Sequence, residues 1–145
     1  MSKDVLTAAN IELNATPAGK EEAIRNTGEI LVANGYVDKE YIDKMLEREE
    51  QKTTYMGNFL AILHGTDNAK QYVHATGIAI TVVPEGIDFG EGNTAKVIFG
   101  IAGENDEHLD LLANIAIVCS DPKTIDHILT AESKQDIIDL FSEVE

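Results

Sequence analysis

The sequence contains one cysteine, three prolines and no tryptophan. Because a lone cysteine cannot form a disulfide within the chain, this composition fits a reducing compartment. Cys119 lies in the apolar run ANIAIVCS and is predicted to be a small buried side chain. No apolar run approaches the roughly 20 residues of a transmembrane helix, and the N-terminus MSKDVLTAAN lacks the basic region and apolar stretch of a signal peptide. We therefore expect a soluble, cytoplasmic protein.

Positive charge is also scarce, since 11 lysines and arginines stand against 26 acidic residues, giving a formal net charge of -15. Such a chain repels nucleic-acid backbones and anionic membranes, whereas it attracts a basic protein partner. The simpler interpretation of the charge is a well-solvated surface. The sequence also lacks the GxxxxGK[ST], GxSxG and GxGxxG motifs, which removes the usual sequence support for nucleotide binding and serine hydrolysis.

The chain length of 145 residues matches one ordinary domain, which we predict to span residues 1–145. Apolar spacing predicts a short strand in ANIEL, a helix over residues 20–34 and a second helix capped by Asp38. The short apolar runs FLAIL, GIAITVV and KVIFGIA favour buried strands. A polar connection containing PEG and FGEG is predicted between the last two strands.

The last third of the chain is predicted to be helical. One helix is expected over residues 106–118, a second after Asp121 and Pro122, and a third after Ser133, with an apolar stripe that runs to Val144. Helices mixed with buried strands predict an α/β protein, a single-domain sandwich with a central mixed β-sheet flanked by helices.

His64 directly follows the predicted strand FLAIL and precedes Gly65. Ligands of open α/β sheets collect at the carboxyl ends of strands, and a glycine there lets backbone N–H groups approach an anion closely. Thr66 adds a hydroxyl donor. The local pattern supports equally a histidine that merely ends a strand, so His64 marks a candidate anion site and no more.

Two further side chains extend this candidate site. His108 lies in the first turn of a predicted helix, where the helix dipole disfavours imidazolium and exposed amides attract an anion, although Asp106 and Glu107 act in the opposite direction. Arg48 lies along the edge of an apolar helical stripe, from which it could reach inward and steady a phosphoryl group. The simpler interpretations are a surface histidine and a snorkelling or salt-bridged arginine.

The other histidines, His74 and His127, are predicted to be solvated. A metal site can be drawn from His64, Asp67, His74 and His108. No pair among them shows the HExxH or CxxC type of spacing that supports such an assignment.

Taken in order along the chain, the motifs resemble the mannitol/fructose-type enzyme IIA domain of the bacterial phosphoenolpyruvate-dependent sugar phosphotransferase system, and most of all its mannitol-specific branch. The segment MGNFLAILHGT is similar to the family's active-site signature, a small residue followed by an apolar-Ala-apolar-Pro-His-Gly run. The resemblance extends nearly from end to end through KEEAIRNTGEILVANGYVDKEYIDKMLERE, PEGIDFGEG and GENDEHLDLLANI.

The resemblance implies a protein-histidine phosphotransferase that serves mannitol uptake. His64 matches the phosphorylated histidine of the family, while His108 and Arg48 match its second active-site histidine and its arginine. His64 would accept a phosphoryl group from phosphorylated HPr, the general phosphocarrier protein. It would then pass the group to a cysteine of the IIB domain of the mannitol IICB transporter. No metal or soluble cofactor is implied, because catalysis would consist mainly of positioning and charge stabilisation.

The sequence departs from the signature at Leu63, which stands where the family has proline. Proline fixes its own φ and restricts the residue before it, so we expect leucine to leave the approach to His64 less constrained. Two other functions are considered: a regulatory IIA-like module that signals through phosphorylation-dependent protein contact, and a metal-dependent hydrolase.

Overall fold

The computed structural model describes residues 5–142. Their strands are β1 (Ile11–Glu12), β2 (Tyr55–Gly57), β3 (Leu60–Leu63), β4 (Gly77–Asp88) and β5 (Thr94–Ala102). The α-helices are α1 (Lys20–Ala33), α2 (Glu40–Gln51), α3 (Glu107–Val118), α4 (Pro122–Thr130) and α5 (Lys134–Ser142), and short 3-10 helices lie at η1 (Ala8–Asn10), η2 (Asp67–Tyr72) and η3 (Glu104–Asp106). Within this part of the chain, none of the helices has the length and apolarity needed to cross a bilayer.

The strands form one mixed sheet in the order β1-β4-β5-β3-β2. β3 runs parallel to β5, with Leu63 opposite Gly100, whereas β4 and β5 are antiparallel. Because parallel strands end at the same edge of a sheet, the residues after β3 and after β5 emerge side by side. This edge brings His64, which follows β3, close to the start of α3.

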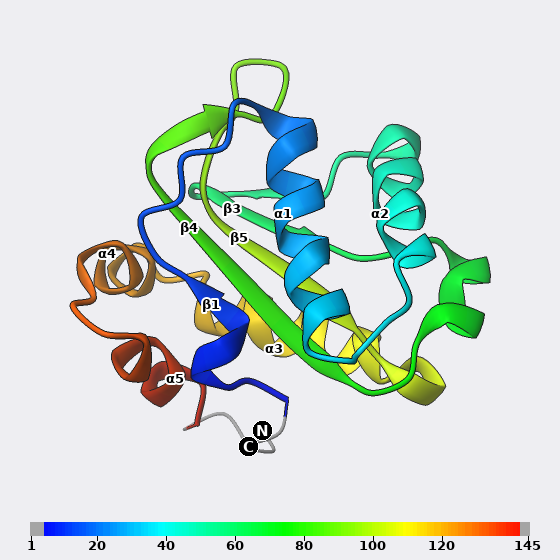
Figure 1. The fold of residues 1–145 in the computed structure, drawn as a ribbon. Helices are drawn as coiled ribbons and strands as arrows, with labels where there is room; N and C mark the ends of the chain where they lie inside the picture. Colours follow the sequence, from blue (N-terminus) through cyan, green and yellow to red (C-terminus); the bar gives the residue numbers. More distant parts are fainter. Residues whose placement is uncertain (1–4, 143–145) are drawn as a thin grey trace.

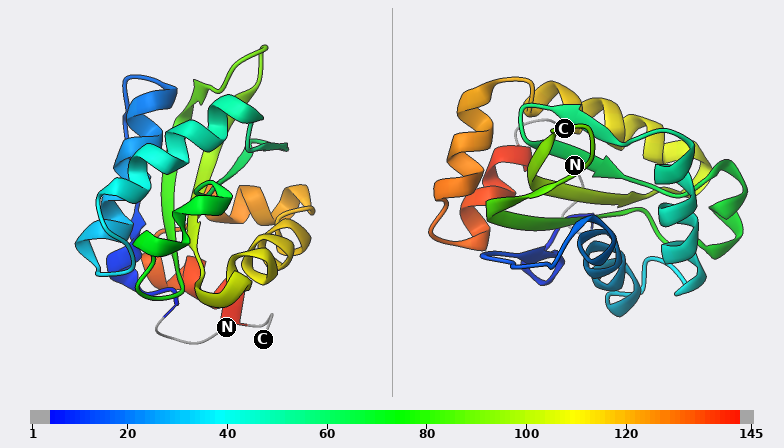
Figure 2. Two further views of the ribbon diagram at one scale, coloured as in Figure 1. Left: turned by 90° about the vertical axis from the view of Figure 1, so that its right-hand side faces the viewer. Right: turned by 90° about the horizontal axis from the view of Figure 1, so that it is seen from above.

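Two apolar cores lie on opposite faces of the sheet. On one face, α1 and α2 pack against the sheet through residues such as Ile24, Leu31 and Met45. On the other face, α3, α4 and α5 pack against it through apolar residues such as Ile115. Figures 1 and 2 show these two helical layers with the sheet between them. The predicted α/β sandwich with a mixed sheet flanked by helices is confirmed.

Several of the predicted elements are found with close boundaries. The first helix is α1, and the helix predicted at 106–118 is α3. Asp121 caps α4 by accepting a hydrogen bond from the Lys123 N–H at 2.9 Å. The N–H of Asp136 donates to Ser133 Oγ at 3.3 Å at the start of α5. The last part of the predicted α5 stripe, at Val144, lies outside the described residues.

Three predictions of detail were wrong. Asp38 does not cap α2 through its side chain, because its carboxylate pairs with His74 instead. The segment PEG is not a loop. It continues β4, where Gly86 at φ 77° accommodates an irregularity in the pairing with β5. The short edge strand β2 was not predicted, because its three residues carry no clear alternation of apolar side chains.

Candidate functional site

The imidazole of His64 is half-buried at the end of β3. Its Nδ1 lies 3.2 Å from the carbonyl oxygen of Ile62. A carbonyl oxygen can only accept a hydrogen bond, so Nδ1 carries the proton and Nε2 keeps its lone pair in the neutral ring. The backbone two residues earlier thus selects one tautomer of His64.

The electrostatic surroundings of His64 favour a neutral ring. Burial contributes most to lowering the pKa of His64 below its ordinary value of 6.5, and electrostatic interactions with the nearby Arg48 and His108 lower it further. The hydrogen bond to Ile62 and the negative charge of Glu49 oppose this shift. Because the lowering effects prevail, His64 is uncharged at pH 7 and its Nε2 can act as a nucleophile.

The residue after His64 is held by a buried phenol. The N–H of Gly65 donates to Tyr41 Oη at 3.0 Å, and Tyr41 Oη donates to the Ile101 carbonyl at 2.8 Å. Burial raises the pKa of Tyr41 to about 12, so its hydroxyl stays protonated. A Cβ on Gly65 would lie 2.8 Å from the Tyr41 ring and 2.9 Å from Ala69, so only glycine fits here.

These contacts revise the expected use of Gly65 and Thr66. Because Gly65 N–H is bonded to Tyr41, it is not available to an anion in this arrangement. The hydroxyl of Thr66 donates to the side-chain oxygen of Asn68 at 2.5 Å. The sequence had suggested that Gly65 lets the backbone approach a ligand. In the structure Gly65 instead allows close packing against Tyr41 and Ala69.

His108 lies in the first turn of α3, beside His64. The two ring centroids are 6.4 Å apart and the ring planes differ by 30°. Gly103 makes this approach feasible, since a Cβ there would lie 2.1 Å from the backbone nitrogen of His108. Asn105 and Asp106 form the turn into α3 with φ values of 52° and 67°, and no side chain caps the helix.

An ion pair joins the two loops that flank this site. Lys70, in η2 after His64, pairs with Asp106 at the start of α3. The cleft between the loops is lined by Tyr41, Gly65, Thr66, Lys70 and His108, among others. The ion pair therefore ties the segment after His64 to the start of α3, and His108 faces the cleft between them.

Arg48 approaches the site from the other side. It is half-buried near the end of α2, and its Nη1 donates to the Lys52 carbonyl oxygen at 2.6 Å. It lines a second cleft with Thr66 and Asn68, which belong to the segment after His64. The structure thus brings all three predicted site residues to one edge of the sheet, with Arg48 tied to its own helix terminus.

The remaining histidines lie apart from this arrangement. His74 Nε2 is 2.7 Å from Asp38 Oδ1 on the surface, and His127 is exposed on α4. Within residues 5–142, no three His, Cys, Asp or Glu side chains gather as a metal site would require. Cys119 is buried as predicted, and burial raises the pKa of its thiol to about 12.

Two residues that support the site from behind were not predicted as site residues from the sequence. Tyr41 and Glu49 both lie on the buried stripe of α2, with Met45 between them at intervals of four residues. Their positions carried a usable signal, because a phenol or a carboxylate on a buried face needs a polar partner. The identity of those partners depends on contacts with residues distant along the chain.

The fold and the site together define a class: an α/β protein with a half-buried histidine at the end of a strand and a second histidine in the first turn of a neighbouring helix. Residues 4–144 match the family model described as "Phosphoenolpyruvate-dependent sugar phosphotransferase system, EIIA 2". The chain belongs to this family.

Individual relatives agree with this assignment. The "Mannitol-specific phosphotransferase enzyme IIA component" of Bacillus subtilis is 56% identical over 140 residues, which cover 97% of this chain and 98% of the relative. The crystal structure of IIA mannitol from Escherichia coli matches with a TM-score of 0.87 and 39% identity, covering 94% of this chain and 98% of that chain.

A second solved structure is similar over almost the same length. It is the complex of enzyme IIAMTL with phosphorylated enzyme IIBMTL from Escherichia coli, which matches with a TM-score of 0.90 and 38% identity over 95% of this chain and 97% of that chain. The roles of His64, His108 and Arg48 in this chain stay predictions.

Proposed function

We propose that this chain is a cytoplasmic phosphocarrier of a mannitol phosphotransferase system, with His64 as the residue that is phosphorylated. The observation that carries the proposal is the neutral His64 ring, whose Nδ1 is bonded to Ile62 and whose Nε2 keeps its lone pair. The mannitol-specific name of the Bacillus subtilis relative and the phosphorylated IIB partner of the Escherichia coli relative support the same function.

In the first step, Nε2 of His64 attacks the phosphorus of the phosphohistidine on HPr. The new Nε2–P bond forms as the P–N bond to HPr breaks, and no proton has to leave His64. Because Nδ1 remains protonated, the phosphorylated ring carries a positive charge, which the carbonyl oxygen of Ile62 faces. This carbonyl stabilises the phosphorylated ring.

In the second step, a cysteine thiolate of the IIB domain attacks the same phosphorus. The S–P bond forms as the Nε2–P bond breaks, and His64 leaves as a neutral imidazole. Burial, which lowers the pKa of His64, makes the neutral ring the favoured product of this step. The same surroundings therefore serve both the acceptance and the release of the phosphoryl group.

His108 and Arg48 have supporting roles in this proposal. The transferring phosphoryl group carries negative charge on its oxygens, and its transition state is stabilised by fixed donors and positive charge. His108 lies beside the His64 ring, and the positive charge of Arg48 is near enough to lower the pKa of His64. Their side chains would contact the phosphoryl oxygens rather than carry the group.

The acidic surface suits a basic partner. The net charge of -15 would attract the basic residues near the histidine of HPr and speed encounter at low salt. The rate of association should therefore fall as salt rises, because salt screens exposed charges over a distance of about 10 Å at 0.1 M. A rate that is independent of salt would contradict steering but not phosphoryl transfer.

The test of the proposal is phosphorylation by the donor chain. The protein is incubated with phosphoenolpyruvate, enzyme I and HPr, and its intact mass is measured at neutral or mildly basic pH. We expect one phosphoryl group on the wild-type chain and none on His64→Ala, with His127→Ala as the matched control. No mass increase on the wild-type chain, or an undiminished increase on His64→Ala, would contradict the proposal. Transfer to mannitol-type and fructose-type IIB domains then tests the sugar assignment.

A further inference from the structure

A buried carboxylate lies behind the His64 site. The side chain of Glu49 is only 4% exposed, and its Oε1 accepts hydrogen bonds from both the N–H and the hydroxyl of Thr54. Its other oxygen, Oε2, is 2.9 Å from the ammonium of Lys20. Among the described residues, Oε2 has no hydrogen-bond partner besides this ion pair.

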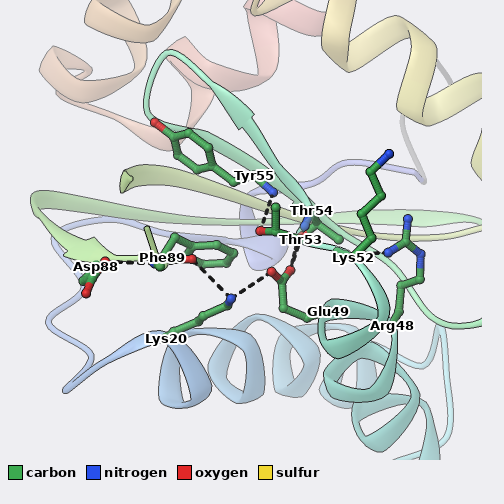
Figure 3. A network of polar contacts seen from close by, with 10 residues as sticks. Lys20, Arg48, Glu49, Lys52, Thr53, Thr54, Tyr55, Asp88 and Phe89 are labelled. Atoms are coloured by element: carbon green, nitrogen blue, oxygen red, sulfur yellow. Dashed lines mark hydrogen bonds and ion pairs between the residues drawn. The ribbon is translucent and has the colours of Figure 1, made fainter. Parts of the chain in front are cut away.

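Lys20 is itself fixed in this position. Its ammonium donates to the Phe89 carbonyl oxygen at 3.2 Å and lies 4.8 Å from the centroid of the Phe89 ring. Figure 3 shows the lysine reaching from α1 between Phe89 and Glu49, while Glu49 faces Thr54 on its other side. The Glu49 carboxylate is thus bound on one side by Lys20 of α1 and on the other by Thr54, which are far apart in the sequence.

Hydrogen bonds lead from this cluster to His64. Glu49 fixes Thr54, whose carbonyl oxygen accepts from the Ile62 N–H at 3.1 Å. The carbonyl oxygen of Ile62 in turn faces Nδ1 of His64 at 3.2 Å. Ile62 is therefore held on its N–H side by the segment that Glu49 fixes, and on its carbonyl side it selects the tautomer of His64.

The charge of Glu49 acts on the site as well as its geometry. Burial alone would raise the pKa of Glu49, but hydrogen bonds from Thr53, Thr54 and Lys20 outweigh burial and lower that pKa. The side chain is therefore ionised at neutral pH. Its negative charge favours the protonated form of His64, whereas burial, Arg48 and His108 favour the neutral form. Glu49 therefore opposes the shift of His64 toward the neutral ring.

We propose that Glu49 is a positioning residue of the phosphocarrier site: its buried carboxylate fixes Thr54 and, through it, the Ile62 peptide that holds His64 with Nδ1 protonated. The expected effect of Glu49 on phosphoryl transfer rests on the proposed function. The geometric part concerns the unphosphorylated protein and can be measured without any phosphoryl donor. Glu49 touches no reacting atom, so its effect would pass entirely through the backbone and the electrostatic field at His64.

The test compares Glu49→Gln with Glu50→Gln, which removes the same charge from an exposed position one residue further along α2. Histidine ¹⁵N NMR over a pH series reports the tautomer and the titration midpoint of His64 in each protein. We expect the wild type and Glu50→Gln to share one neutral tautomer with Nδ1 protonated. In Glu49→Gln the midpoint should fall, because the opposing negative charge is gone, and the second tautomer should become detectable.

Transfer from phosphorylated HPr supplies the second readout. We expect Glu49→Gln to accept the group about tenfold more slowly than Glu50→Gln, since small errors in the position of a reacting atom are costly. Thermal unfolding establishes which variants are folded. If Glu49→Gln does not fold, Thr54→Val takes its place in the tautomer measurement. A His64 tautomer and midpoint identical in the paired variants would overturn the inference, even if Glu49→Gln were less stable. Failure of the wild type to accept a phosphoryl group would instead overturn the proposed function and leave the NMR result standing.

Discussion

The two histidines of the site are held in different ways. His64 stands at the end of a buried strand, where Ile62 fixes its ring and Tyr41 fixes the next peptide. His108 stands in the first turn of α3, after a turn with two positive φ values and an ion pair between exposed side chains, Lys70 and Asp106. His64 is anchored to the buried sheet, which we call the anchored side of the site, and His108 is presented from the helix start that follows a surface turn, which we call the loop side.

This difference matches the two roles in the proposed function. A carrier must present one nitrogen, in one protonation state, to two successive partners, and a buried anchor supplies that constancy. A helper supplies a donor to the phosphoryl group without carrying it, and a side chain in the first turn of a surface helix can do this without a buried anchor. The anchored side should therefore respond to mutation through stability and tautomer, and the loop side through the rate of transfer alone.

The largest effect on the loop side is expected for His108→Ala. Phosphoryl acceptance should slow about a hundredfold, because one donor to a charged transition state is lost, while the final mass increase is retained. Rapid-quench kinetics with phosphorylated HPr measures this rate. His74→Ala, which removes a surface histidine remote from His64, should be unchanged. If His108→Ala accepted no phosphoryl group at all, the division between carrier and helper would be wrong.

On the anchored side, Tyr41→Phe should lower the free energy of unfolding by about 1–3 kcal/mol, because Gly65 N–H and the Ile101 carbonyl lose a buried partner. Urea denaturation at 25 °C measures the change. Tyr55→Phe is the control: its exposed hydroxyl accepts from Phe59 N–H at 3.2 Å, and the loss should stay within about 0.5 kcal/mol. Equal losses in the two variants would contradict the anchoring role of Tyr41.

The pH dependence sharpens the same comparison. Only the neutral His64 ring can attack, so the acceptance rate should rise with pH to a plateau, with a midpoint below 6.5 because burial lowers the pKa of His64. In the same range the unfolded chain binds a proton more readily than the folded one. The wild type should therefore lose stability relative to His64→Gln as pH falls through 6.5. A midpoint at or above 6.5 would count against the buried, neutral ring.

The smallest effect is expected for Leu63→Pro, which restores the residue of the family signature. Leu63 is 1% exposed and lies opposite Gly100 on β5. Proline would restrict the approach to His64 and should speed transfer a few-fold at most, since Ile62 and Tyr41 already hold the site. Single-turnover rates for the wild type, Leu63→Pro and the volume-conserving control Leu63→Ile measure this. Equal rates in all three would show that leucine does not loosen His64.

On the anchored side, the sequence predicted the strand end at His64 but not the contacts of Tyr41 and Glu49 that hold it. The apolar run before His64 and the glycine after it were sufficient to predict a strand end, because period and turn residues are local signals. The partners of Tyr41 and Glu49 were not predictable in this way. Tyr41 meets Ile101, which is 60 residues away, and Glu49 meets Lys20 from α1. Such pairings depend on how the layers pack, which a single sequence does not display.

On the loop side, the sequence predicted the helix that carries His108 but not the geometry of the turn before it. The helix that carries His108 was predicted to within a residue, but it was the family resemblance that assigned His108 to the site. The positive φ values at Asn105 and Asp106 and the close fit at Gly103 were not foreseen, although they aim the helix start at His64. Turn geometry depends on φ choices that Asn and Asp tolerate but do not dictate.

The position of the phosphoryl group on the ring tests the central claim most directly. Protein labelled with ¹⁵N-histidine is phosphorylated by HPr, and NMR distinguishes phosphorylation at Nε2 from phosphorylation at Nδ1. The hydrogen bond between Nδ1 and Ile62 predicts a phosphoryl group on Nε2 of His64. A phosphoryl group on Nδ1 of His64, or on His108 in the wild-type protein, would contradict the account.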